Sequence, residues 1–309
     1  VIGHARPPSR GASDFQVEVG ALRRVPRKNA SELLKLAPGF FLSSEGGEGH
    51  PARVYLRGFD AREGQDIEIS VDGVPVNESG NLHGNGYADT HFLIPELVLS
   101  LRVLEGPFDP RQGNYAVAGS ADFELGLEQR GLTAKYSRGS FGTERLLLTW
   151  GPPDESLHTF GGAEIFRSDG FGQNRDQRRA AAMGQYEGAL GPNASFRLGA
   201  AAHVTEFHSA GLLREDDVEA GRKAFFDTYD RRQGGSGSRF QVSAELESRT
   251  RDVILNQQVF AVRRQMRLLE NFTGFLLDAQ QAQQSLHAQR GDLFDLGMSE
   301  TTVGARGFA

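Results

Sequence analysis

The sequence predicts a small α+β first part followed by an antiparallel transmembrane β-barrel, of which about eight strands are present. Three observations support this fold class. Residues 29–128 combine a short helix with extended segments, residues 131–309 form a series of alternating strands, and the connections between those strands are short and long in turn. We expect residues 1–28 to be an N-terminal tail, because proline, glycine and serine are frequent there.

The composition of the 309 residues excludes several classes of protein. The absence of cysteine excludes disulfides, thiol catalysis and cysteine-ligated metal sites. The net charge of −6 disfavours a nucleic-acid partner, because such proteins usually carry a basic face. No apolar run reaches the roughly 18 residues that a transmembrane helix needs. Hydropathy does not exclude a membrane barrel, whose strands alternate apolar and polar residues.

The first ordered elements follow the tail. Residues 15–19 are a short extended piece within it. Asn29 is the predicted N-cap of a short helix over residues 30–36, and its spacing to Glu32 resembles a capping box. Pro38-Gly39 then ends the helix.

Three extended segments, a loop and a second short helix complete the first part. The extended segments are residues 52–57, 66–72 and 101–105. The middle one alternates apolar and polar residues and ends in Asp72-Gly73, the signal of a two-residue hairpin turn. A polar, glycine-rich loop spans residues 77–90, and Pro95 starts a short helix over residues 94–99.

The second part is predicted to consist of strands with one apolar face. Residues 240–247 place Phe240, Val242, Ala244 and Leu246 on one face, and residues 196–204 place Phe196, Leu198, Ala200, Ala202 and Val204 on one face. The next segment is less regular, and we predict a strand to about Arg267 followed by an external loop. A helix within residues 256–289 is the alternative, since glutamine, leucine, arginine and alanine are frequent there.

The lengths of the connections favour a membrane barrel. Short connections are expected at residues 152–156, 191–194 and 248–252, and long ones at residues 169–177, 209–238 and 268–292. Outer-membrane barrels have tight turns at one end and long loops at the other, whereas compact soluble domains seldom have loops of this length. A soluble β-sandwich or β-solenoid with insertions is the alternative.

Six short motifs in residues 29–125 occur in the order typical of one known domain. They are Pro38-Gly39-Phe40, Arg57-Gly58, Asp72-Gly73-Val74-Pro75-Val76-Asn77, Ile94-Pro95, Gly106-Pro107 and the glycine-punctuated run from Gly113 to Gly119. With these motifs the segment resembles the plug domain of TonB-dependent outer-membrane receptors. The resemblance implies that a barrel of about 22 strands follows the plug.

Two departures from the family pattern stand out, one at Glu105 and one at Gln112-Gly113, where the family usually has Tyr-Gly. Glu105 occupies the position before Gly106-Pro107 where the family usually has arginine, so Arg102 or Arg111 is expected to take that role.

At about 20 residues for each strand with its connection, residues 131–309 hold about nine strands. We therefore expect this sequence to be a fragment of a longer receptor. The energy-coupling segment of the family falls just before or at Val1-Ile2 and is expected to be truncated.

The resemblance implies an outer-membrane receptor of a Gram-negative bacterium that takes up a scarce solute, foremost a ferric siderophore. The implied partners are a TonB-type inner-membrane energy-coupling protein, outer-membrane lipid and a small external ligand such as a metal chelate. We expect a monomer without a bound cofactor or a nucleic-acid partner. Uptake of cobalamin, heme or oligosaccharide, or signalling with little transport, are alternatives. An enzyme is disfavoured because no catalytic motif of a known class occurs in the sequence.

Candidate functional residues fall into two groups. Arg57, Asp72 and Arg111 are the expected contacts between the plug and the barrel wall, with an ordinary turn or solvated role as the alternative. The family places the loop 77–90 toward the outside, so the expected substrate contacts are His83, Tyr87, Asp89 and His91. A metal site formed by His83, Asp89 and His91 is a weaker hypothesis, since histidine and carboxylate ligands suit transition metals.

Overall fold

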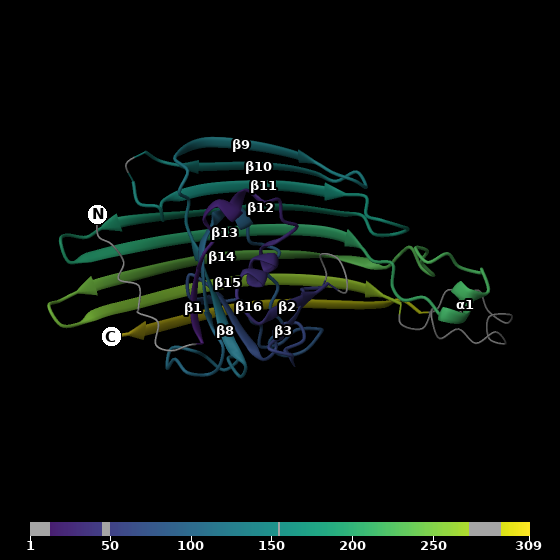
Figure 1. Ribbon diagram of the computed structural model, residues 1–309, viewed down its shortest axis with the longest axis horizontal. Coiled ribbons are helices and arrows are strands. Elements are labelled where there is room, and N and C mark those ends of the chain that lie inside the picture. Colours follow the sequence, from purple (N-terminus) through teal and green to yellow (C-terminus); the bar gives the residue numbers. More distant parts are fainter. Residues whose placement is uncertain (1–12, 45–49, 154, 272–291) are drawn as a thin grey trace.

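The computed structural model describes residues 13–44, 50–153, 155–271 and 292–309. A first domain, up to Glu128, lies across one face of a large eight-stranded sheet, which we call the wall (Figure 1). Within the described residues, no helix has both the length and the apolar character needed to cross a lipid bilayer.

The main sheet of the first domain has five strands in the order β1, β7, β8, β5, β6. Their bounds are β1 (Asp14–Glu18), β5 (Ile67–Val71), β6 (Val74–Pro75), β7 (Val98–Leu104) and β8 (Gly119–Leu125). The strands expected at residues 66–72 and 101–105 are confirmed as β5 and as part of β7. Strand β7 begins earlier than expected, because the helix expected at residues 94–99 is only the single turn η3 (Pro95–Leu97).

The segment expected to be an N-terminal tail differs from that expectation from residue 13 onward. Strand β1 pairs antiparallel with β7 from Asp14↔Leu104 to Glu18↔Ser100, and a 3-10 helix, η1 (Gly20–Arg24), follows it. Phe15 and Val17 pack against the core of the domain, so burial of apolar side chains holds this stretch in place.

A smaller sheet joins β2 (Phe40–Ser43), β3 (Arg53–Leu56) and β4 (Phe59–Asp60). The helix expected at residues 30–36 is a 3-10 helix, η2 (Ala30–Leu36), which buries Leu33 and Leu34. Asn29 stands at the N-cap position but its side chain makes no capping hydrogen bond. Instead it accepts a hydrogen bond from Ser31 and contacts His91 Nε2 at 3.0 Å.

The wall is an antiparallel meander in which each strand pairs with the next in the chain. Its strands are β9 (Gly131–Arg138), β10 (Glu144–Gly151), β11 (Phe160–Ser168), β12 (Gln177–Ala189), β13 (Ala194–His208), β14 (Gly234–Arg249), β15 (Ile254–Glu270) and β16 (Phe294–Phe308). The described part of the chain thus contains the eight strands that were expected. The alternative helix is wrong up to Glu270, and its remainder, residues 272–289, lies outside the described residues.

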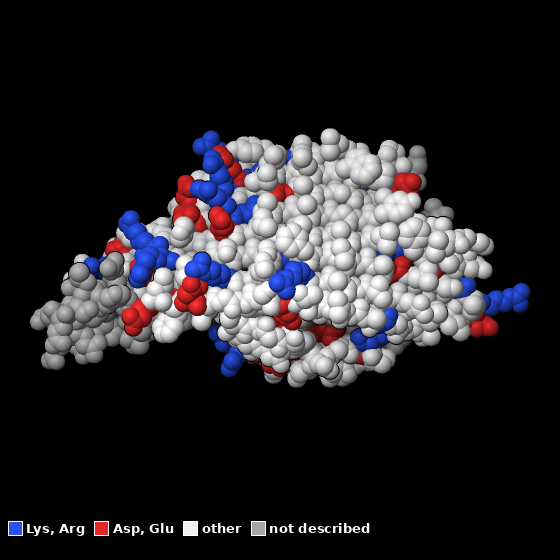
Figure 2. Space-filling view, turned by 180° about the vertical axis from the view of Figure 1, so that it is seen from behind, with Lys and Arg blue, Asp and Glu red and all other residues white. Residues whose placement is uncertain are grey.

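Each strand of the wall separates its residues between two faces. On β10, Leu147 is 4% exposed, whereas its neighbours Leu146 and Leu148 are 42% and 40% exposed. The inward face is rich in buried polar side chains, including Thr149, Gln177, Gln185, Thr205, Gln241 and Gln258. The outward face is largely uncharged over its middle, with charges gathered toward the ends of the strands (Figure 2). A polar inner and apolar outer face is the pattern of a membrane barrel.

The connections of the wall differ between its two ends. Residues 152–159, 190–193 and 250–253 join strands at one end, and residues 139–143, 169–176 and 209–233 join them at the other. The longest fully described loop contains α1 (Glu215–Glu219), at the right of Figure 1. The predicted alternation is confirmed for the short connections 190–193 and 250–253 on either side of the long loop 209–233, whereas residues 152–159 and 169–176 form connections of equal length.

Candidate functional site: the interface and cavity between the first domain and the wall

A buried ionic network joins the first domain to three strands of the wall. Arg145 of β10 donates from both terminal nitrogens to Glu96 of η3, at 2.5 and 2.6 Å, and from Nε to Glu164 of β11 at 2.6 Å. Arg179 of β12 donates to the other oxygen of Glu164 at 2.8 Å and to the carbonyl oxygen of Lys28 at 2.7 Å. Charged hydrogen bonds in buried positions are directional, so this network fixes where the first domain sits.

The loop over residues 77–90 is held by a second arginine of the wall. Arg264 of β15 forms ion pairs with Glu78 and, at 3.3 Å, with Asp89, and its guanidinium lies 4.9 Å from the centre of the Tyr87 ring. Burial raises the pKa of Asp89, but the charge and hydrogen bonds of His91 outweigh it and lower that pKa. The Asp89 carboxylate therefore faces the arginine as an anion.

The hairpin turn of the first domain touches the wall at its other end. Asp72 and Gly73 have φ values of 46° and 75°, the left-handed pair of a type I′ turn, which confirms the hairpin signal. The Asp72 carboxylate lies 3.8 Å from Arg197 of β13, and its carbonyl oxygen accepts a hydrogen bond from Gln258 of β15 at 2.8 Å. A Cβ at Gly73 would lie 2.1 Å from the guanidinium of Arg306.

The other two expected wall contacts lie elsewhere. Arg57 forms its ion pair with Glu105 of the first domain, so the expected bridge from Arg57 to the wall is replaced by an internal pair. Arg111 donates to Asp109 at 2.8 Å and reaches the wall only through the Phe308 ring, 5.8 Å from its guanidinium carbon. The expected energy-coupling residues, Val1 and Ile2, lie outside the described residues.

A cavity of about 1320 Å³ separates the first domain from the wall at the end that carries the long loops. The first domain supplies residues 26–28 together with His50, Glu63 and His83. The wall and its loops supply Arg138, Phe141, Arg145, Phe171, Arg175, His208, Gln233 and Glu270, among others. Cationic side chains outnumber the two glutamates in this lining, which favours an anionic ligand.

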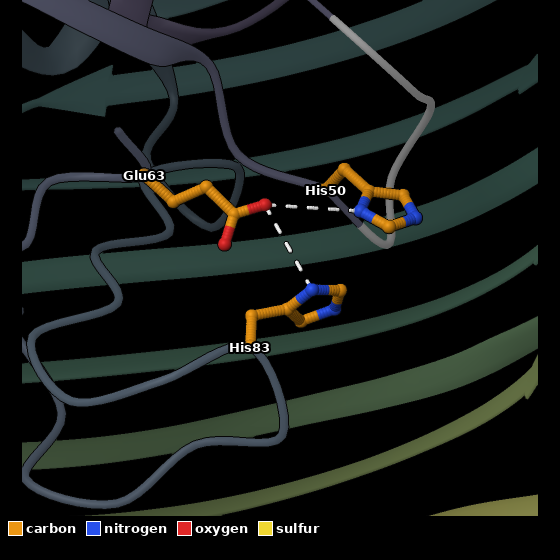
Figure 3. Close-up of side chains that lie close together, drawn as sticks. All are labelled: His50, Glu63 and His83. Atoms are coloured by element: carbon orange, nitrogen blue, oxygen red, sulfur yellow. Dashed lines mark ion pairs between the residues drawn. The ribbon is translucent and has the colours of Figure 1, made fainter. Parts of the chain in front are cut away.

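Two histidines and a glutamate of the first domain meet at the floor of this cavity (Figure 3). Glu63 Oε1 lies 3.9 Å from His50 Nδ1 and 3.8 Å from His83 Nδ1. Glu270 at the end of β15 approaches from the wall, with its Oε1 3.2 Å from His50 Nε2. The ligand atoms of His50, Glu63 and His83 all lie within 4.8 Å of one another, close enough to hold one metal ion.

The two histidines differ in their protonation. Burial lowers the pKa of His50, but hydrogen bonds and charges of Glu270 and Glu63 outweigh it and raise the pKa to about 9. For His83, burial dominates over the charge of Glu63 and lowers the pKa. The His83 ring stacks on Tyr87 at 5.4 Å, and Tyr87 is completely buried. At neutral pH the cluster therefore holds one charged and one neutral imidazole.

Of the four residues expected to contact substrate, only His83 lines the cavity. Tyr87 is buried beneath the His83 ring, and His91 is buried with its Nδ1 2.6 Å from Oδ1 of Asp89. Asp89 lines a separate small cavity of about 20 Å³, which has room for one water molecule. The weaker metal hypothesis is corrected in its composition, because the groups beside His83 are His50 and Glu63 rather than Asp89 and His91.

Aromatic side chains from three loops form the rim of the cavity. Phe141 and Phe171 lie 6.1 Å apart, and Phe171 meets Phe226 edge to face at 6.0 Å. The guanidinium of Arg175 lies 5.6 Å from the Phe171 ring centre and 5.9 Å from that of Phe226. These rings are about half exposed, so they can contact a ligand with planar or apolar groups.

Comparison with known proteins covers both parts of the chain. The family described as the TonB-dependent Receptor Plug Domain matches residues 12–120. A curated relative, the vitamin B12 transporter BtuB of Vibrio vulnificus (strain CMCP6), is 29% identical over 108 residues, which are 35% of this chain and 16% of that protein.

Solved structures share the arrangement of domain and wall. The copper transporter OprC superposes with a TM-score of 0.65 and 17% identity, over 97% of this chain and 42% of its own. The unliganded ferric citrate transporter FecA superposes with a TM-score of 0.65 and 15% identity, over 83% of this chain and 40% of FecA. A ferric enterobactin receptor mutant (PfeA, G324V) of Pseudomonas aeruginosa superposes with a TM-score of 0.62 and 14% identity, over 96% of this chain and 46% of the receptor. The chain thus spans less than half the length of these relatives.

The fold is that of a barrel wall with a plug domain seated against its polar inner face. The match to the plug-domain family shows that residues 12–120 are a TonB-dependent receptor plug domain, and the arrangement of this domain and the wall is shared with the solved transporters OprC and FecA. Its relatives are transporters and receptors rather than enzymes. The first domain is therefore called the plug from here on.

Proposed function

We propose that the protein takes up a scarce external solute by energy-coupled movement of its plug. The observation that carries this proposal is the character of the interface between plug and wall. Arg145, Arg197 and Arg264 of the wall bind plug carboxylates through ion pairs, and such polar contacts can exchange for water when the plug is pulled. A plug held by a large apolar interface would resist such a movement.

The lining of the cavity favours a metal chelate, foremost a ferric siderophore, as the transported solute. Its arginines favour an anion, and its aromatic rim at Phe141 and Phe171 favours planar groups. The relatives are named for copper, ferric citrate, ferric enterobactin and vitamin B12, so metal-containing cargo is common to all four.

The outward face of the wall supports a location in the outer membrane. Leu148, Leu198, Val242, Val259 and Val303 point outward and are at least 40% exposed. Contact with lipid acyl chains removes such side chains from water. A TonB-type inner-membrane protein would bind near the start of the chain, and the receptor would act as a monomer.

Ligand binding by the intact receptor tests this proposal. A panel of ferric siderophores, ferric citrate, cobalamin, heme and oligosaccharides is titrated against the purified protein. We expect one ferric chelate to bind, and Arg175→Gln to weaken that binding at least tenfold, which is about 1.4 kcal/mol. Arg167→Gln is the matched control, because Arg167 is an exposed arginine that pairs with Glu144 away from the cavity.

Two outcomes would contradict the proposal. The first is a receptor that binds no member of the panel. The second is intact receptor in liposomes that lets small solutes leak freely, because a seated plug blocks the lumen.

A further inference from the structure

We propose that His50, Glu63 and His83 of the plug form a binding site for one divalent transition-metal ion, with Glu270 of the wall orienting His50 through the ring nitrogen that faces away from the ion. The role of this ion as cargo rests on the proposed uptake function, whereas its binding does not. The site would accept an ion that is free or is released by a weak chelator.

The geometry is close to what a metal ion requires. Ligands that hold Zn²⁺ at 2.0–2.1 Å in a tetrahedron lie about 3.3–3.5 Å apart. Glu63 Oε1 is 3.8 Å from His83 Nδ1 and 3.9 Å from His50 Nδ1. A contraction of about 0.5 Å in each of these two distances would bring Glu63 and each imidazole to coordination distance, and the two imidazoles, which lie within 4.8 Å of each other, would also move closer together by side-chain rotation.

The ligand set selects the class of ion. Two imidazoles with one or two carboxylates suit Zn²⁺, Cu²⁺, Ni²⁺ and Co²⁺, whereas Mg²⁺ and Ca²⁺ prefer oxygen ligands alone. The chain has no cysteine, so the site lacks the thiolate ligands that favour Cu⁺.

The surroundings of the cluster also fit a metal site. The side chains of His50, Glu63 and His83 are 22%, 22% and 17% exposed, so an ion arriving through the cavity can reach them. His83 is oriented by its stacking on buried Tyr87, and its Nε2 is buried without a hydrogen-bond partner among the described residues.

Glu270 connects this site to the wall. Its carboxylate approaches His50 Nε2 at 3.2 Å, although Glu270 lies on β15 and His50 lies in the plug. An ion bound at His50 Nδ1 would leave Nε2 to donate a hydrogen bond to Glu270, and this contact links the site to the wall beneath the cavity. The alternative is an ion-pair cluster without affinity for metal, which the following experiment separates.

The test is a titration of the intact, metal-free receptor with Zn²⁺ by calorimetry, in the presence of excess Mg²⁺. We expect one saturable site, and an affinity at least tenfold lower in both His50→Gln and His83→Gln. His208→Gln is the matched control, because His208 lines the same cavity but pairs with Asp176 at 3.0 Å, and it should bind like the wild type. Co²⁺ in place of Zn²⁺ should give the absorption of a tetrahedral or five-coordinate ion.

Absence of saturable Zn²⁺ and Co²⁺ binding by the wild type would overturn the proposal, as would unchanged affinity in both histidine variants. Thermal unfolding of each variant without metal identifies a folding defect. If a variant does not fold, the test uses thermal unfolding of the wild type instead. Zn²⁺, and not Mg²⁺, should raise the unfolding temperature of the wild type if the site binds a transition metal. The chelate panel is run on the same preparation, so failure of the uptake proposal and failure of the metal site are separate results.

Discussion

Arg145 of the wall and Glu96 of the plug form a two-pronged ion pair, with hydrogen bonds of 2.5 and 2.6 Å and side chains only 8% and 13% exposed. The pair lies where the first helical turn of η3 meets β10. This ion pair joins two segments that are far apart in the sequence. Its strength therefore contributes directly to the stability of the contact between plug and wall.

Replacement of Glu96 by Gln should loosen the plug, because Arg145 then keeps its buried charge with only Glu164 as an acidic partner. Removing one partner of a buried pair typically costs about 3–5 kcal/mol. Hydrogen exchange of the plug amides in the intact receptor would measure this loss. Asp295→Asn is the control, because its ion pair with Arg267 is more than half exposed and should contribute at most about 1 kcal/mol. Equal effects of the two substitutions would contradict the role of the Glu96 pair.

The contact between Asp72 and the wall should make plug stability depend on pH. Burial raises the pKa of the Asp72 carboxyl to about 7, more than the nearby Arg197 can lower it, and Asp122 and Glu245 raise it further. Because the unfolded chain has the ordinary pKa of about 3.9, protonation favours the folded state. The contribution is complete below about pH 4 and is lost as the pH rises through about 7.

Asp72→Asn should remove this part of the pH dependence. Unfolding of the plug in denaturant, measured at several pH values across that window, would test it. A wild-type curve and a variant curve with the same slope between pH 4 and 7 would show that Asp72 does not titrate there.

Two adjacent glycines of β11 offer a test of the packing between plug and wall. A Cβ at Gly162 would lie 2.7 Å from Cδ1 of fully buried Leu97, whereas at Gly161 no atom lies within 4 Å. Overpacking typically costs about 1–3 kcal/mol. Gly162→Ala should therefore weaken the seating of the plug, while Gly161→Ala should be neutral or slightly stabilising. The comparison is made by thermal unfolding, and a neutral Gly162→Ala would argue against close packing at Leu97.

The apolar outward face should tolerate a charge only near its edge. Val242, in the middle of β14, is 56% exposed on this face. Val242→Arg should destabilise the receptor folded in lipid vesicles by about 2–4 kcal/mol. Gln265→Arg, on the same face but toward the long-loop end of β15, should cost at most about 1 kcal/mol. If both cost the same, the middle of this face does not lie in the hydrocarbon layer.

Local patterns predicted the elements well where one face of a segment is buried. The alternation of residues 196–204 and 240–247 gave both the strands β13 and β14 and their outward faces, because period-two burial is a property of the strand alone. The same reasoning located the Asp72-Gly73 turn, since only certain residues adopt its positive φ values.

The contacts between plug and wall were harder to predict. Asp72 and Arg197 do face each other, but Arg57 pairs internally, and Arg145, Arg179 and Arg264 were missed. A signal for them existed, because each occupies an inward position of an alternating strand in a polar lumen. Which plug residue each would meet was not contained in that signal.

By itself the sequence determined the class of fold, the two faces of the wall strands and the family of the plug domain, because these depend on periodicity and on local turn chemistry. Only the tertiary structure decided that His83 joins His50, Glu63 and Glu270 while Asp89 and His91 are buried apart from them. These side chains come from three loops of the plug and the end of β15, and their meeting depends on how the plug is seated against the wall, which no local pattern specifies.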